Sequence, residues 1–72
     1  MMSLNEVTDG KRVVITGIDG GRNARKKLMD LGIIPGVQVT ITRRAGRNPM
    51  LLSVMGRQVV LGRGMAEKVL VR

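Results

Sequence analysis

The sequence predicts a mainly β protein, a small five-stranded barrel of the SH3-like type with one short helix. Three observations predict this fold. The chain of 72 residues has room for one domain, over 1–72. Its ten glycines divide it into segments too short for long helices. In several of these segments apolar residues recur at every second position, the period of a strand with one buried face. Closing such strands into a barrel removes the apolar edges of an open sheet.

The first strand is expected over residues 11–18, which are rich in β-branched side chains and lie between Asp-Gly and Asp-Gly-Gly turns. Gly17 near its end predicts a bulge or a bend, as small barrels need at their corners. Residues 22–31 differ, because they contain no β-branched residue and place apolar residues at i, i+4 and i+7. A short helix is therefore expected over 22–31.

The residues that follow this helix predict how it ends. Gly32 suits the left-handed conformation that terminates many helices, and Pro35–Gly36 suits the turn into the next strand. That strand covers 37–43, where apolar and polar residues alternate strictly. We expect Leu28 and Leu31 to anchor the helix on the barrel, so that this whole segment serves folding first.

Three shorter elements complete the predicted barrel. Residues 50–54 place three large apolar side chains on one face, and residues 58–61 form their hairpin partner across a turn at 56–57. A single 3-10 turn is expected near 63–67, because this segment is too short for a longer helix. A last strand over 68–71 closes the chain.

The composition excludes most classes of enzyme and most structural metal sites. Thirteen Lys and Arg against five Asp and Glu give a net charge of +8, and Cys, His, Phe, Trp and Tyr are all absent. There is no thiol, no imidazole and no aromatic ring on which a base could stack. We therefore expect no catalytic residue, no metal ligand set and no cofactor. No signal peptide or apolar run of about 20 residues is present, so a cytoplasmic protein is expected.

A family resemblance covers nearly the whole chain. The residues that carry it are Leu4, Gly10, Ile15 and Ile18; the segment Leu-Met-Asp-Leu-Gly-Ile-Ile-Pro-Gly at 28–36; Val37 and Val39; and Pro49, Val54, Gly56, Val59, Leu61, Ala66, Val69 and Val71. In this order they resemble the ferrous iron transport protein A (FeoA) family, most specifically in the segment 28–36. Relatives of that family include the SH3-like C-terminal domain of iron- and manganese-dependent repressors.

The resemblance implies a function. It implies an accessory role in bacterial or archaeal ferrous iron uptake, as a non-enzymatic adaptor on a membrane transporter that carries a cytoplasmic GTP-binding domain. The family is also often grouped under transition-metal ion binding. Because the chain lacks a DNA-binding helix-turn-helix segment, it resembles the free-standing protein rather than a repressor.

Two groups of residues are candidates for partner binding. Basic side chains gather on one face of the helix and in the loop after the strand 37–43, and apolar ones are candidates for direct contact. These candidates are Arg22, Arg25, Lys26, Arg43, Arg44 and Arg47, with Ile33, Ile34 and Met65. Cations in the first turns of a helix oppose its dipole, which favours an anionic partner such as an acidic protein or the inner face of a membrane. The alternative is a charged face that only keeps the protein soluble.

Two other functions stay open at this point. The net charge of +8 would suit a small-barrel nucleic-acid binder, although the lack of aromatic residues disfavours it. A metal-sensing domain would have only carboxylates, main-chain oxygens and Met sulfurs as ligands, and each carboxylate is read first as a turn or cap residue. Short edge strands and a small core are also compatible with a homodimer.

Overall fold

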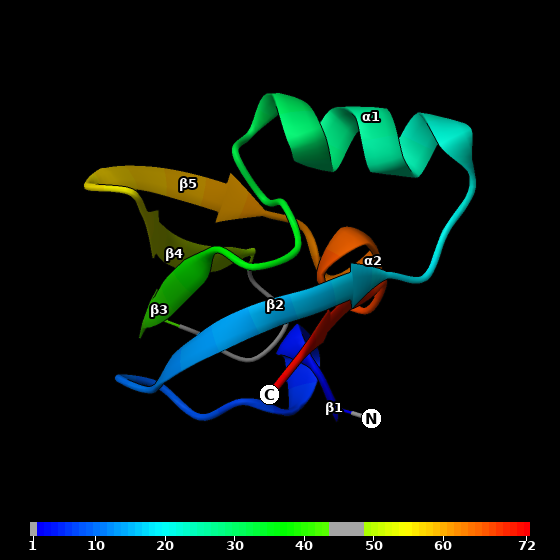
Figure 1. Cartoon of the computed structure of the whole chain (residues 1–72). Helices are drawn as coiled ribbons and strands as arrows, with labels where there is room; N and C mark the ends of the chain where they lie inside the picture. Colours follow the sequence, from blue (N-terminus) through cyan, green and yellow to red (C-terminus); the bar gives the residue numbers. More distant parts are fainter. Residues whose placement is uncertain (1, 44–48) are drawn as a thin grey trace.

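The computed structural model describes residues 2–43 and 49–72 and shows a curled antiparallel sheet with its longest helix along one side (Figure 1). The strands lie in the order β1-β6-β2-β3-β4-β5. Their bounds are β1 (Met2–Ser3), β2 (Arg12–Ile18), β3 (Gln38–Arg43), β4 (Met50–Val54), β5 (Arg57–Leu61) and β6 (Val69–Val71). The helical elements are the 3-10 turn η1 (Leu4–Glu6), α1 (Arg22–Asp30) and α2 (Arg63–Ala66).

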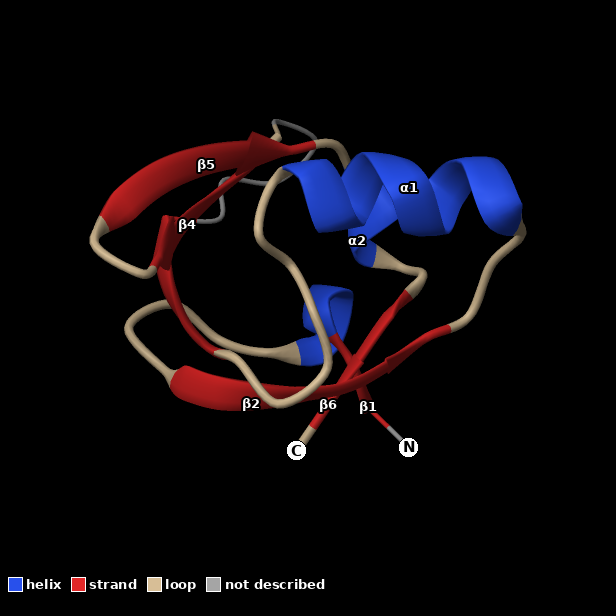
Figure 2. Ribbon diagram, turned by 45° about the horizontal axis from the view of Figure 1, so that its top comes forward, coloured by secondary structure: helices blue, strands red, loops and turns tan. Residues whose placement is uncertain are grey.

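Two irregularities in strand pairing let the sheet curl into a barrel (Figure 2). The register between β2 and β6 shifts between Ile15 and Gly17, so the bulge predicted at Gly17 is confirmed. A second shift lies between Ile41 and Arg43, where β3 pairs with β4. A bulge bends its strand and increases the local twist, which brings the two ends of a short sheet toward one another.

The core is entirely aliphatic. The three large apolar residues on the inner face of β4, Met50, Leu52 and Val54, are buried, as the alternation in 50–54 predicts. From α1 the side chain of Leu28 is fully buried, and Leu31 just after the helix is half-buried against the same cluster. No polar or charged residue among the described ones is buried, so all the charged chemistry of this part of the chain lies at its surface.

The structure corrects the predicted fold in two details. It contains a sixth strand, β1, whose residues Met2 and Ser3 pair with Val71 and Leu70 of β6. The predicted 3-10 turn near 63–67 is instead one α turn, because the Ala66 N–H donates to the carbonyl four residues earlier. Ala66 is fully buried, and the α turn directs it into the core. The 3-10 turn of the structure lies at η1 instead.

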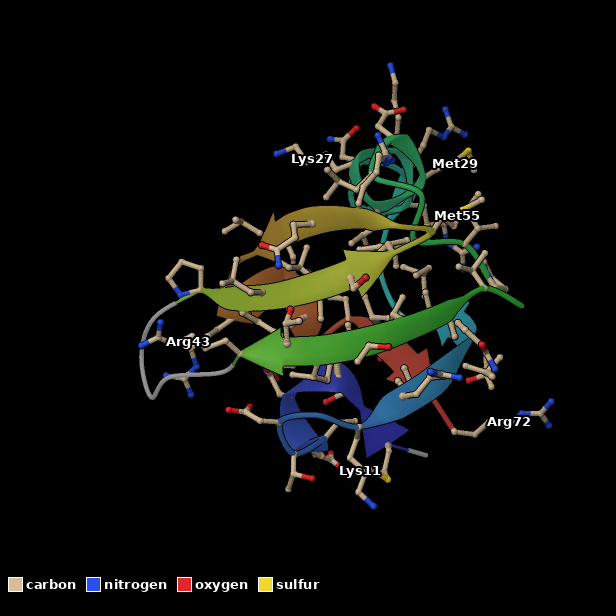
Figure 3. All side chains as sticks on the ribbon, turned by 90° about the vertical axis from the view of Figure 1, so that its left-hand side faces the viewer. Lys11, Lys27, Met29, Arg43, Met55 and Arg72 are labelled. Atoms are coloured by element: carbon tan, nitrogen blue, oxygen red, sulfur yellow. The ribbon has the colours of Figure 1, made fainter. Side chains whose placement is uncertain are left out.

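The helix α1 lies beside β5 (Figures 1 and 3) and ends as its sequence predicts. Its last helical residue is Asp30, and Gly32 adopts a φ of 84°, which confirms the left-handed position. Several strand ends differ from the predicted ones by a single residue, the usual uncertainty at element boundaries. None of the described helices combines the length and the apolar character that crossing a membrane requires.

Candidate functional site

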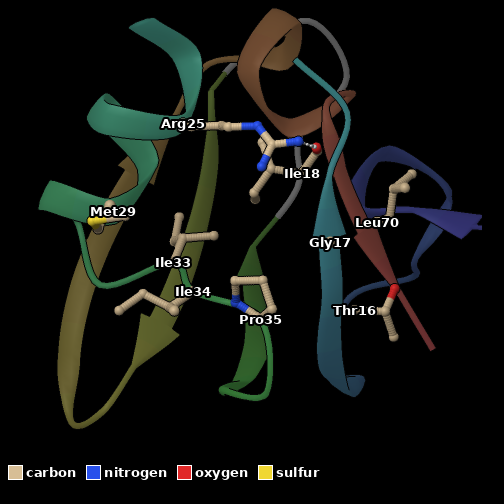
Figure 4. Close-up of a pocket in the computed structure, with 9 residues that line it drawn as sticks. All are labelled: Thr16, Gly17, Ile18, Arg25, Met29, Ile33, Ile34, Pro35 and Leu70. Atoms are coloured by element: carbon tan, nitrogen blue, oxygen red, sulfur yellow. Dashed lines mark hydrogen bonds between the residues drawn. The ribbon is translucent and has the colours of Figure 1, made fainter. Parts of the chain in front are cut away.

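A pocket of about 480 Å³ opens on the face framed by α1, β2 and the loop that follows α1 (Figure 4). Four segments contribute its lining, three of them between residues 16 and 35 and the fourth in β6. The lining residues are Thr16, Gly17, Ile18, Arg25, Met29, Ile33, Ile34, Pro35 and Leu70. Because eight of these nine residues are uncharged and Arg25 is cationic, the pocket is an apolar cavity with positive charge at one place on its edge.

The loop after α1 is held by backbone hydrogen bonds. The Gly36 N–H donates to the Ile15 carbonyl of β2 at 2.7 Å, and the Val37 N–H donates to the Ile34 carbonyl at 3.1 Å. Because these bonds fix the backbone of the loop, the side chains of the two neighbouring isoleucines differ in burial. Ile33 is 1% exposed and belongs to the core, whereas Ile34 is 41% exposed at the mouth of the pocket. The loop therefore presents the Ile34 side chain to solvent on a backbone held by hydrogen bonds.

Arg25 closes the pocket at the end nearest the start of α1 (Figure 4). Its Nε donates to the Gly20 carbonyl at 3.2 Å, and its Nη2 donates to the Ile18 carbonyl at 3.3 Å. A guanidinium carries five N–H donors, so these two bonds fix its position and leave donors for a ligand. The side chain is solvent-exposed, and its charge therefore acts at the pocket mouth rather than inside the core.

The acidic residues are absent from the pocket lining. Asp19 and Glu67 line a separate depression beside α2, together with Lys68. Glu6 lines another, near β1, with basic neighbours. Asp30 is exposed at the end of α1 and does not line the pocket. Nothing in the lining therefore neutralises Arg25, and the pocket mouth is suited to a group of negative charge.

The predicted basic face of α1 meets this pocket at Arg25, which lines it together with Met29. Arg22 and Lys26 are exposed but do not line the pocket, and Arg22 lines a depression near α2. Met29 is 60% exposed. Lys27 lines the same depression near α2, and Figure 3 shows Lys27 and Met29 on opposite sides of the helix.

The other candidate residues separate in space. Ile33 was expected to be an exposed contact residue, but it is buried in the core, because the helix-ending turn directs it inward; it contributes only to the pocket floor. Met65 is half-buried on the α2 side of the molecule. Arg43 is exposed at the end of β3, well away from Met29 (Figure 3). The predicted residues Arg44 and Arg47 lie outside the described part of the chain.

Sequence reasoning missed several residues of the site. Met29 gave one usable signal, because it is the sole large apolar residue outside the buried stripe of α1. The sequence contains no signal for Leu70 or Thr16, since only the pairing of β6 with β2 brings them together at the pocket. A further basic cluster, Lys11, Arg12 and Arg72, lines the depression near Met2 and was also not predicted.

The described residues offer no metal centre. Among residues 2–43 and 49–72 no group of three or more His, Cys, Asp and Glu side chains comes together. Residues 44–48 are Arg, Ala, Gly, Arg and Asn, so their side chains would add no carboxylate. The pocket, with its mostly apolar lining and the cation of Arg25, is suited to binding an apolar group and an anion.

Comparison with known proteins gives matches over nearly the whole chain. The family model described as the FeoA domain matches residues 2–72. A protein of Methanocaldococcus jannaschii named "Putative Fe(2+) transport protein A" is 31% identical over 71 residues, which covers 99% of this chain and 85% of that protein. The crystal structure of an iron uptake regulatory protein, FeoA, has a TM-score of 0.94 at 34% identity and covers 99% of this chain and 95% of its own.

More distant structures share the fold. FeoA of Stenotrophomonas maltophilia, solved in complex with zinc and described as a prokaryotic SH3 domain protein, has a TM-score of 0.85 at 23% identity, over 100% of this chain and 91% of its own. A manganese-dependent transcriptional repressor has a TM-score of 0.86 at 17% identity, over 94% of this chain and 39% of its own. These likenesses confirm the predicted SH3-like fold, which the repressor shares over part of its length.

Proposed function

The chain belongs to the FeoA family, which indicates an accessory role in ferrous iron uptake, and from this premise we propose that it acts as an adaptor on the transporter of that system. The proposed partner is the cytoplasmic GTP-binding domain of the membrane transporter. The proposed action is protein–protein contact without catalysis, at the cytoplasmic face of the membrane.

The observation that carries this proposal is the pocket beside α1. Met29 and Ile34 expose 60% and 41% of their surface at its mouth, on a loop and a helix that the core holds in place. Exposed apolar groups around a concave site are typical of surfaces that bind other proteins. The exposed basic side chains of α1, Arg22, Arg25 and Lys26, would attract an acidic surface toward this side of the molecule and speed its association.

The chemistry of the site supports an adaptor rather than an enzyme. The pocket lining contains a single charged side chain, Arg25, and its one hydroxyl, Thr16, has no acidic or imidazole neighbour in the lining to act as a general base. A binding function needs only shape, apolar surface and charge, and the pocket has all three.

A binding measurement tests the proposal. The GTP-binding domain of the transporter encoded in the same genome is immobilised, and binding of the purified chain is measured at low and physiological salt with GDP and with a non-hydrolysable GTP analogue. We expect saturable binding that weakens about tenfold or more when Met29 and Ile34 are both changed to Ser.

The matched control is Met55→Ser. Met55 is 74% exposed at the turn between β4 and β5, so the change removes a similar exposed apolar side chain that does not line the pocket. This variant should bind as the parent does. If the parent chain fails to bind in either nucleotide state at low salt, the proposal is wrong.

A further inference from the structure

We infer that the pocket beside α1 selects a partner segment in which a carboxylate side chain adjoins an apolar residue. The apolar side chain enters the pocket, and the carboxylate binds the guanidinium of Arg25. This inference rests on the proposed function, because it specifies the chemistry of the partner surface that the same pocket recognises.

The shape of the pocket requires an apolar side chain that projects from its partner. The pocket holds about 480 Å³, within the usual range for sites that enclose a ligand group. Its floor includes the buried Ile33, and its mouth is bordered by Met29 and Ile34. An aliphatic side chain that enters this space loses contact with water on most of its surface, which is the main source of affinity at such sites.

The position of Arg25 adds the requirement for a carboxylate. Its two hydrogen bonds, to the carbonyl oxygens of Gly20 and Ile18, hold the guanidinium at the pocket edge before any ligand arrives. A cation that is already fixed loses less conformational freedom on binding than a mobile surface side chain does. Its remaining N–H groups match the geometry of a carboxylate.

Charge identifies the occupant as a segment of another protein. A second copy of this chain would bring a net charge of +8 toward an identical charge, which disfavours close approach. The internal segment outside the described residues, 44–48, carries two Arg and no large apolar residue, so it does not have the required chemistry. A lipid bilayer also has negative charge, but its surface cannot fill a concave site as a projecting side chain does.

The test uses short peptides and the intact chain labelled with ¹⁵N. The probe is the blocked peptide Gly-Ser-Glu-Leu-Glu-Ser-Gly, and two variants replace both Glu by Gln or replace Leu by Ser. Amide chemical shifts are followed during titration, with Gly17, Ile18 and Ile34 as reporters of the pocket. We expect saturable shifts for the first peptide, about three- to tenfold weaker binding for the Gln peptide, and no saturable shifts for the Ser peptide.

Substitutions in the protein separate the charge of Arg25 from its place in the fold. Arg25→Gln should bind the Glu and Gln peptides equally, and Arg25→Lys should restore a preference for Glu. Lys27→Gln is the matched control, because it removes one charge from the same helix on the side opposite Met29 (Figure 3) and should keep the preference. Each variant is first required to give the dispersed amide spectrum of the parent.

The outcomes distinguish this inference from the proposed function. Equal affinity of the parent for the Glu and Gln peptides, or the absence of saturable shifts, overturns the inference. Vesicles of anionic phosphatidylglycerol and of neutral phosphatidylcholine are tested in the same way. The inference is also overturned if the pocket amides respond to the phosphatidylglycerol vesicles alone and do not respond to the peptide. If the transporter domain binds the parent and Arg25→Gln equally, the proposed function stands and the inference falls. If the parent chain prefers the Glu peptide but does not bind the transporter domain, the inference stands and the proposed function falls.

Discussion

The Ile33 N–H donates to the Leu28 carbonyl at 2.9 Å, and this bond closes the C-terminus of α1. The Gly32 N–H donates to the Met29 carbonyl, also at 2.9 Å. Together these bonds form a Schellman motif around the left-handed Gly32, and the two residues that flank the motif, Leu28 and Ile33, are both buried in the core. The same turn that ends the helix therefore directs Ile33 into the core and Ile34 to the pocket mouth.

The first prediction concerns the residue at the centre of this motif. Gly32→Ala should lower the free energy of unfolding by about 1–2 kcal/mol, because an L-residue at a φ of 84° is strained. An added Cβ would lie 3.5 Å from Arg57 Nη2, an ordinary contact, so the cost comes from the backbone. Urea denaturation measures it.

Gly64→Ala is the control for that measurement. Gly64 lies within α2, and a Cβ there would meet no atom within 4 Å. Because Gly is unfavourable inside a helix, this change should leave stability unchanged or raise it by up to about 1 kcal/mol. Equal destabilisation by the two substitutions would contradict the role assigned to Gly32.

The second prediction compares two neighbouring residues of α1. Leu28→Ala removes a fully buried side chain and should cost about 2–5 kcal/mol in the free energy of unfolding. Met29→Ala changes a side chain that is 60% exposed and should cost less than about 0.5 kcal/mol, although it should weaken partner binding. Thermal unfolding followed by circular dichroism, beside the binding assay, separates the two effects. If Met29→Ala unfolds the protein as Leu28→Ala does, the pocket is part of the core.

Most of the fold could be predicted because the pattern of local residues decides it. The alternation in 50–54 predicts which face of β4 is buried, and Gly32 predicts where α1 ends. The strand β1 could not be predicted, since Met2 and Ser3 form a strand only through pairing with β6, at the far end of the chain. Contacts between distant segments leave no periodic signal in so short a strand.

The site could be predicted only in part. The basic face of α1 follows from the spacing of Arg22, Arg25 and Lys26, because a helix repeats every 3.6 residues. Ile33 is buried and Ile34 is exposed because of the hydrogen bonds in the loop after α1. The sequence shows two identical neighbouring residues and so gives no sign of which one is buried. The pocket itself exists only where four separate segments meet.

The third prediction compares two adjacent lysines of α1. Lys26→Glu should slow association with the transporter domain and reduce its dependence on salt, because Lys26 lies three residues before Met29 of the pocket mouth, the spacing of neighbours on a helix surface. Lys27→Glu changes the net charge equally but lies on the side of the helix opposite Met29 (Figure 3), so its effect on the association rate should be smaller. Stopped-flow kinetics at several ionic strengths measure both. Equal slowing would mean that net charge alone, and not the position of Lys26, steers binding.

The fourth prediction concerns nucleic acid as an alternative partner. The net charge of +8 should produce non-specific binding to mixed-sequence RNA that falls steeply with salt, by the release of counterions. With no aromatic residue to stack bases, the binding should vanish near physiological salt. Fluorescence anisotropy with labelled RNA measures it. Tight binding that persists at physiological salt would make RNA the better candidate partner.

The last prediction concerns metal binding by the chain itself. We expect that equilibrium dialysis against micromolar Fe²⁺ or Mn²⁺, followed by elemental analysis, leaves no stoichiometric metal on the protein. The physical reason is the distribution of the carboxylates. Asp19 and Glu67 line the same depression, but Lys68 lines it with them, and a cation beside two carboxylates opposes the binding of a second one. Ions of this kind require several oxygen ligands around one point, and no three acidic residues of the described chain supply them.

The control for this measurement is the double variant Asp19→Asn, Glu67→Gln, which removes both carboxylates from this depression. Parent and variant should retain the same trace of metal. If the parent holds one equivalent and the variant none, the pair binds metal despite Lys68, and the depression beside α2 becomes a metal-sensing site. In that case metal would act on a face of the barrel distinct from the pocket, and its effect on partner binding could be measured directly by repeating the transporter assay with and without the ion.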